Sequence, residues 1–254
     1  MSSPSGNKDA GSELSGMTAE DMFNRGRDHY RGNGVPKSYE DAARWYRLAA
    51  ERGHIRAQYR LGLMYVKGIG VKQSNAEALI LWGAAAERGH DCSQFELGFM
   101  YGAGMGVKQD YAAAMMWYEL AAKQGNAMAQ NNLGLMYELG KGVQRNDAEA
   151  MRWWRLAAEN GNMTSQYNIG LIYDKGLGVR RNEDEAFRWY ALAAEQGHPQ
   201  ARINLENMRR DGKRAPKQNP AAEVKERAAC KGHCSLSDTG ENVCTGKCNA
   251  VEAH

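Results

Sequence analysis

The 254-residue sequence contains no long apolar run. Its first sixteen residues, MSSPSGNKDAGSELSG, show neither the basic start nor the apolar stretch of a secretory signal. No later window approaches the roughly 20 apolar residues that cross a bilayer. We therefore expect a soluble, cytoplasmic protein that does not insert into membranes.

A strong net charge is also missing. The 33 lysines and arginines nearly balance the 30 aspartates and glutamates, and the two signs are interspersed. This excludes the basic footprint that is typical of nucleic-acid-binding proteins. Cysteine is scarce too. The chain has five cysteines, and four of them lie in the last 25 residues. The body of the chain therefore cannot depend on a disulfide framework.

What the sequence has instead is a repeat of 36 residues. Five ungapped blocks and the first part of a sixth begin at Ala19, Ile55, Asp91, Ala127, Met163 and Pro199. Every full block contains two glycines one residue apart, as in YVKGIGVKQ, where Gly68 and Gly70 precede a lysine. A phosphate-binding loop would not be copied five times, and the lysine is not kept in all copies. The pattern predicts a turn between two helices.

Each block reads as a pair of helices. In the first helix of the second block, Ala57, Leu61 and Tyr65 recur at steps of four and form one buried face. The second helix of each block follows a residue suited to capping, and these residues are Ser38, Ser74, Asp110, Asn146 and Asn182. It ends at a glycine, and these glycines are Gly53, Gly89, Gly125, Gly161 and Gly197.

Small and large residues alternate along these helices in a fixed register. One glycine lies inside each first helix, at Gly26, Gly62, Gly98, Gly134 and Gly170. A helical glycine costs about 1 kcal/mol relative to alanine, so we expect close approach of the partner helix, which carries paired alanines, to offset it. Bulky aromatics recur in the second helices, at Tyr46, Trp82, Tyr118, Trp154 and Tyr190. We interpret them as packing residues and not as a cofactor site.

Units such as AQYRLGLMYVKGIGVKQSNAEALILWGAAAERGH resemble Sel1-like repeats, which are related to tetratricopeptide repeats, and the resemblance covers about residues 19–213. It implies an all-α fold, a right-handed α-solenoid of antiparallel helix pairs with five full repeats and one terminal helix. We expect a disordered segment at 1–17, the solenoid at 18–213, and a linker with a cysteine-containing tail at 214–254.

The resemblance also implies a non-enzymatic adaptor or scaffold that binds a peptide or protein on its concave surface. The inner-face positions of the related family map onto two rows of the first helices. The first row is Phe23, Tyr59, Phe95, Asn131 and Tyr167; the second row, one turn further on, is Leu63, Phe99, Leu135 and Leu171, with Arg27 at the same position of the first block. Such an apolar groove suits an amphipathic helix or an extended peptide. The alternative is that many of these residues pack between neighbouring repeats and never meet a partner.

No residue set points to catalysis, and we predict no cofactor. Cys92 lies close to His90, but no third group completes a catalytic set, which favours a structural cysteine. Some cysteine-rich members of the family are described as hydrolases of β-lactams. This sequence lacks their paired cysteines in each unit, and it has no S-x-x-K motif. The alternative function is therefore an exported member with a disulfide-bonded tail and β-lactam hydrolase activity.

The tail carries two C-x3-C pairs, formed by Cys230, Cys234, Cys244 and Cys248. Four thiolates, or three with His233, are a weak candidate for a tetrahedral zinc site. Two disulfides in a small hairpin are the second interpretation, which implies an oxidising compartment. Free thiols in a disordered tail are the third, and the sequence does not choose among them.

Overall fold

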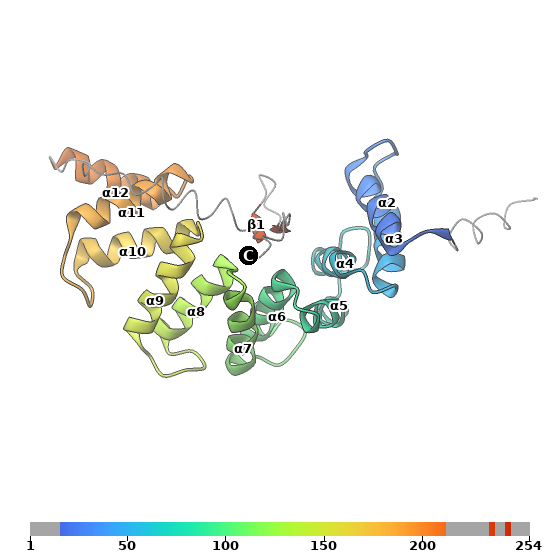
Figure 1. Ribbon diagram of the computed structural model, residues 1–254, viewed down its shortest axis with the longest axis horizontal. Helices are drawn as coiled ribbons and strands as arrows, with labels where there is room; N and C mark the ends of the chain where they lie inside the picture. The colour runs from blue at the N-terminus through green and yellow to red at the C-terminus, as the bar shows by residue number, and fades with distance from the viewer. Residues whose placement is uncertain (1–15, 212–233, 237–241, 245–254) are drawn as a thin grey trace, which may run out of the picture. The chain divides into compact units, whose positions relative to one another are not determined.

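The computed structural model describes residues 16–211, 234–236 and 242–244 (Figure 1). The first helices of the repeats are α2 (Ala19–Arg31), α4 (Ile55–Lys67), α6 (Asp91–Ala103), α8 (Ala127–Leu139), α10 (Met163–Lys175) and α12 (Pro199–Arg210). The second helices are α3 (Tyr39–Glu51), α5 (Asn75–Glu87), α7 (Tyr111–Lys123), α9 (Asp147–Glu159) and α11 (Glu183–Glu195). The predicted all-α repeat of helix pairs is confirmed.

The chain divides into two compact units. The first contains α2 to α5, α6 as far as Met100, and the loop at Gly104–Lys108. The second contains the end of α6 and then α7 to α12. Helices α2 to α5 of the first unit, and α7 to α12 of the second, each pack against the next one along the chain. The cores of both units are therefore built between consecutive helices, as stacked helix pairs require.

A short strand pair lies outside the repeats. Strands β1 (Cys234–Leu236) and β2 (Asn242–Cys244) pair antiparallel, with Cys234 opposite Cys244. The predicted boundaries at 17 and 213 adjoin the limits of the described residues and stay a prediction.

The predicted caps of the second helices are confirmed. Ser38 Oγ accepts the N–H of Asp41 at 3.1 Å, and Asp110 Oδ1 accepts that of Ala113 at 2.9 Å. The first helices are capped by the residue that ends the preceding repeat, which is His54, His90, Asn126, Asn162 or His198. A polar residue at these junctions therefore satisfies an N–H group that the helix leaves without an internal partner.

The glycine pair is a turn, as predicted. Gly68 ends α4 in the left-handed conformation, with φ of 66°. Gly70 lies so close to the preceding repeat that a Cβ atom there would overlap the carbonyl oxygen of Tyr39. Only glycine fits this second position without moving the backbone.

At the recurring glycine position inside the first helices, the contacts described for Gly26, Gly62, Gly134 and Gly170 are with an aromatic ring of the following second helix. A Cβ at Gly26 would lie 2.6 Å from Tyr46 Cδ1, and one at Gly62 would lie 2.8 Å from Trp82 Cδ1. Trp82 Nε1 also donates a hydrogen bond to the backbone oxygen of Tyr59 at 3.1 Å. The paired alanines are buried, except Ala194, which is half-buried, but the ring, not an alanine, occupies the space above the glycine.

A row of buried glutamines joins one repeat to the next, and the sequence analysis did not identify it. Nε2 of Gln94, Gln130 and Gln166 donates at 3.0 Å to the carbonyl of Ala86, Ala122 and Ala158, respectively. Each acceptor lies in the last turn of the preceding second helix, where carbonyls lack internal partners. The glutamines therefore cap helix ends across the joints between repeats.

We expect Gly62→Ala to destabilise the first unit by about 1–3 kcal/mol, because the new methyl group overlaps the Trp82 indole. Gly83→Ala is the matched control, since Gly83 lies in α5 with nothing within 4 Å of an added Cβ. There alanine should stabilise by up to about 1 kcal/mol. Urea unfolding of both variants measures the difference, and equal effects would contradict the ring-on-glycine packing.

The cap at His90 should make stability depend on pH. His90 Nδ1 accepts the N–H of Ser93 at 3.2 Å, which requires this nitrogen to be unprotonated. Burial holds the pKa of His90 below its ordinary value of 6.5, although Asp91 opposes this. The unfolded chain therefore binds the proton more readily, so the cap stabilises the fold above about pH 6.5 and is lost as the pH falls through the folded-state pKa.

Replacing His90 by asparagine, as at Asn126 and Asn162, keeps an acceptor that does not titrate. We expect His90→Asn to change stability by less than about 1 kcal/mol at pH 7.5. It should lose less stability than the wild type between about pH 7.5 and about pH 5. Chemical unfolding at several pH values tests this, and an unchanged pH dependence would show that the cap does not titrate.

Candidate partner-binding face

The two predicted rows differ in how far they reach solvent. In the first row, Phe23, Tyr59 and Asn131 are buried, with exposed fractions of 6%, 2% and 9%, and Phe95 and Tyr167 are half-buried. In the second row, Phe99 is 46% exposed, and Leu63, Leu135 and Leu171 are half-buried. Most of the surface that a partner can reach therefore belongs to the second row.

The buried members of the first row contact the joint with the next repeat. The ring of Phe23 stacks on the His54 ring at 4.6 Å, and Tyr59 lies 5.1 Å from His90. Asn131 Oδ1 accepts a hydrogen bond from Ser165 Oγ at 2.8 Å. Tyr167 also stacks on the next junction residue, His198, at 4.5 Å. The alternative that these side chains pack between repeats thus fits their contacts.

The first helices of the first unit carry several arginines. Burial raises the pKa of Tyr46 to about 12, and the nearby charges of Arg60, Arg31 and Arg27 oppose that rise. Arg27 forms an ion pair with Asp28 at 3.7 Å.

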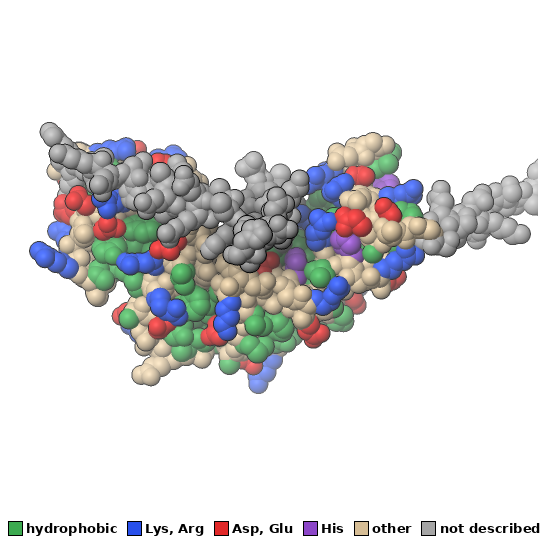
Figure 2. All heavy atoms as spheres, in the orientation of Figure 1, with side chains coloured by type: hydrophobic (Ala, Val, Ile, Leu, Met, Phe, Trp, Pro, Cys, Tyr) green, Lys and Arg blue, Asp and Glu red, His purple; other side chains and the backbone are tan. Residues whose placement is uncertain are grey.

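In the second unit the first helices carry the acidic residues Glu138 and Asp174 as well as apolar residues. Figure 2 shows hydrophobic patches interrupted by charged side chains of both signs.

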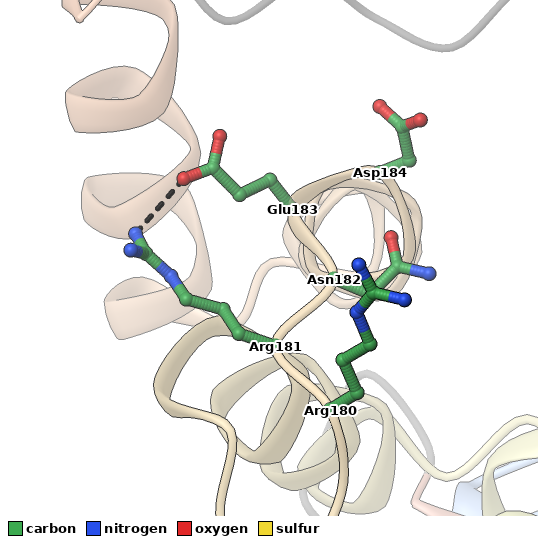
Figure 3. Close-up of a pocket in the computed structure, with 5 residues that line it drawn as sticks. All are labelled: Arg180, Arg181, Asn182, Glu183 and Asp184. Atoms are coloured by element: carbon green, nitrogen blue, oxygen red, sulfur yellow. Dashed lines mark ion pairs between the residues drawn. The ribbon is translucent and has the colours of Figure 1, made fainter.

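A polar pocket of about 490 Å³ lies at the start of α11, formed by residues 180–184 (Figure 3). Arg181 pairs with Glu183 at 2.9 Å, and its Nε donates to the Asp174 carbonyl at 2.9 Å. Asn182 is occupied as the helix cap. Because one short segment supplies all five lining residues and neutralises much of its own charge, the pocket lacks convergent groups for catalysis.

The structure gives no support to a thiol nucleophile. Cys92 is 1% exposed and disulfide-bonded, and its partner is not among the residues whose side chains the structure describes. A sulfur in a disulfide is not a thiolate, so Cys92 and His90 cannot act as nucleophile and base. Within residues 16–211, no three histidine, cysteine or acidic side chains gather as metal ligands.

The predictions for the tail lie largely outside the described residues. Cys230, His233 and Cys248 are not described, and for Cys234 and Cys244 the structure gives the backbone pairing alone. Zinc, disulfide and free-thiol interpretations of these four cysteines therefore stay predictions.

Five stretches of the chain match the Sel1 repeat: residues 19–54, 55–90, 93–126, 127–162 and 164–198. The chain belongs to the Sel1 repeat family. The matched stretches follow the blocks read from the sequence almost residue for residue, which confirms the predicted resemblance. Sel1 repeat proteins generally mediate protein–protein interactions, and their fold is typically a non-enzymatic scaffold.

Solved Sel1 structures share this fold. A protective antigen of uropathogenic Escherichia coli strains, displaying an SLR fold, is 36% identical, with a TM-score of 0.73 over 84% of this chain. This chain spans 46% of that antigen. A Sel1 repeat protein from Oxalobacter formigenes is 31% identical, with a TM-score of 0.72 over 83% of this chain and 85% of its own length.

An immunity protein from Pseudomonas aeruginosa, 23% identical, shares the fold with a TM-score of 0.51 over 83% of this chain and 78% of its own. No curated protein matches the chain. Among the described residues, no helix is both long and apolar enough to span a membrane.

Proposed function

We propose that this Sel1 repeat protein is a non-enzymatic adaptor that binds a peptide or protein through the second row of its first helices. The observation that carries this proposal is Phe99, an aromatic side chain that is 46% exposed at a position where the neighbouring repeats have leucine. Core packing does not require an apolar residue at a site that faces solvent to this extent. A large apolar side chain that is exposed to this extent, in a row whose half-buried members are also apolar, is typical of an interaction surface.

The half-buried leucines of this row and the two half-buried aromatic residues of the first row fit the same role. In the first unit, Leu63 and Phe95 adjoin Phe99 in the repeat register, and in the second unit Tyr167 accompanies Leu135 and Leu171. Aromatic anchors surrounded by aliphatic residues commonly dominate binding energy at protein interfaces. Buried Phe23, Tyr59 and Asn131 would then support the surface from below and make little direct contact with a partner.

The disulfide at Cys92 favours the exported alternative over the cytoplasmic one, because structural disulfides persist in oxidising compartments. The β-lactam hydrolase part of that alternative has no observation in its favour. An exported adaptor would use the same face.

The test is affinity capture from a native extract with wild type, Leu63→Ala/Phe99→Ala and Ile80→Ala. Ile80 is the matched control, since it is an apolar residue of the same unit, 68% exposed, on a second helix. We expect the double variant to lose the partner and Ile80→Ala to retain it. Thermal melting of Ile80→Ala should stay close to wild type, within about 0.5 kcal/mol in stability, as for other surface changes.

Capture that survives in the double variant, or that is lost equally in Ile80→Ala, would contradict the proposed face. Circular dichroism of each variant separates loss of binding from loss of fold.

A further inference from the structure

A second pocket, which is mainly apolar, lies in the second unit between α9 and the loop that joins α10 to α11. Its volume is about 480 Å³, within the range of roughly 300–1,000 Å³ that is usual for ligand sites. Met151, Trp154, Ile172 and Val179 supply apolar lining, and Leu177, which is 57% exposed, also lines it. Trp154 Nε1 already donates to the Asn131 carbonyl at 3.2 Å, so the indole offers the pocket no free donor.

At three joints between repeats, the second glycine of the loop lies against the preceding repeat. At the fourth joint it does not, and this leaves the pocket. A Cβ at Gly70 would overlap the backbone of the preceding repeat, and Cβ atoms at Gly106 and Gly142 would lie 2.8 Å from Asn75 and Tyr111. At Gly178, the equivalent glycine of the fifth repeat, an added Cβ meets nothing within 4 Å. The loop therefore stands away from the preceding second helix, and its leucine is left exposed.

A shallower depression continues from the pocket along α9. It has a volume of about 380 Å³ and shares Ala148 and Met151 with the pocket, and it extends to Leu156 and Glu159. The helical segment from 148 to 159 has eleven steps between residues and spans about 16 Å, which is the length of about five residues of extended chain. A deep apolar end joined to a shallow track suits a short peptide better than a compact small molecule.

The charges at the rim favour a cation. Arg145 donates to both carboxylate oxygens of Asp147, at 3.0 and 3.2 Å, so these two charges neutralise each other. Hydrogen bonding to Arg145 lowers the pKa of Asp147, so this carboxylate stays charged. Glu138, which is exposed and also lines the pocket, adds a further negative charge. The rim of the pocket is therefore negative by one charge, and the depression adds no net charge, because Arg152 pairs with Glu149 at 2.9 Å and Arg155 is matched by Glu159.

We propose that this pocket is a peptide-binding site, separate from the first-helix rows, that takes an aliphatic side chain preceded by lysine or arginine. The aliphatic group covers Leu177 and fills the space above Trp154, and the cation pairs with Glu138. The proposal does not depend on the adaptor face, because no residue of either row lines the pocket, although Glu138 of α8 and Ile172 of α10 come from first helices.

The test uses capped six-residue peptides of serine and glycine with a central Lys-Leu, Glu-Leu or Lys-Ser pair. Methyl NMR of the full-length protein follows the resonances of Ile172, Leu177 and Val179 during titration. We expect saturable shifts with the Lys-Leu peptide and roughly threefold to fivefold weaker binding with Glu-Leu, as for the gain or loss of an exposed ion pair. The Lys-Ser peptide should shift none of these methyl groups.

Leu177→Asp should weaken binding of the Lys-Leu peptide by roughly tenfold or more. Leu139→Asp is its control, because Leu139 is also 57% exposed in the same unit but does not line the pocket. Glu138→Gln should remove the preference for Lys-Leu over Glu-Leu while retaining the leucine-dependent shifts. Absence of shifts with every peptide, or equal loss in Leu139→Asp, would overturn the proposal.

Discussion

The packing of an aromatic ring on a helical glycine holds together the first, second, fourth and fifth repeats. Where a side chain would normally stand, Gly62 and Gly134 expose bare helix backbone, and the indoles of Trp82 and Trp154 lie directly on it. The same indoles donate to a carbonyl of that helix, three residues before the glycine. Burial of a large ring offsets the helix propensity that glycine lacks, and the contact fixes how closely the two helices of a pair approach.

The joints between repeats follow from that geometry. Once each pair is fixed, the residue that ends one repeat caps the first helix of the next, and a buried glutamine such as Gln94 caps the helix before it. Arg47 and Arg155 add a hydrogen bond to the hydroxyl of Tyr65 and Tyr173 in the following repeat. These joints bury Phe23, Tyr59 and Asn131 of the first row, which is why the partner face that we propose is the second row.

Local features were predictable from the sequence because they follow rules that act within a few residues. The glycine turn at Gly68, the cap at Ser38 and the packing role of Trp82 were all read correctly. The sequence left open whether Tyr59 faces a partner or packs between repeats, because its contact with His90 joins residues 31 positions apart in the chain. The pocket at Gly178 could not be predicted either, since its loop has the same glycine spacing as the loops that close.

A double-mutant cycle between Gly134 and Trp154 tests the central claim most directly, with stability measured by chemical unfolding. If the ring occupies the space above the glycine, Gly134→Ala should destabilise the wild type by about 1–3 kcal/mol. In a Trp154→Ala background the same change should be neutral or stabilising, by up to about 1 kcal/mol, because the methyl group then enters empty space. An equal cost of Gly134→Ala in both backgrounds would contradict this account of the fold.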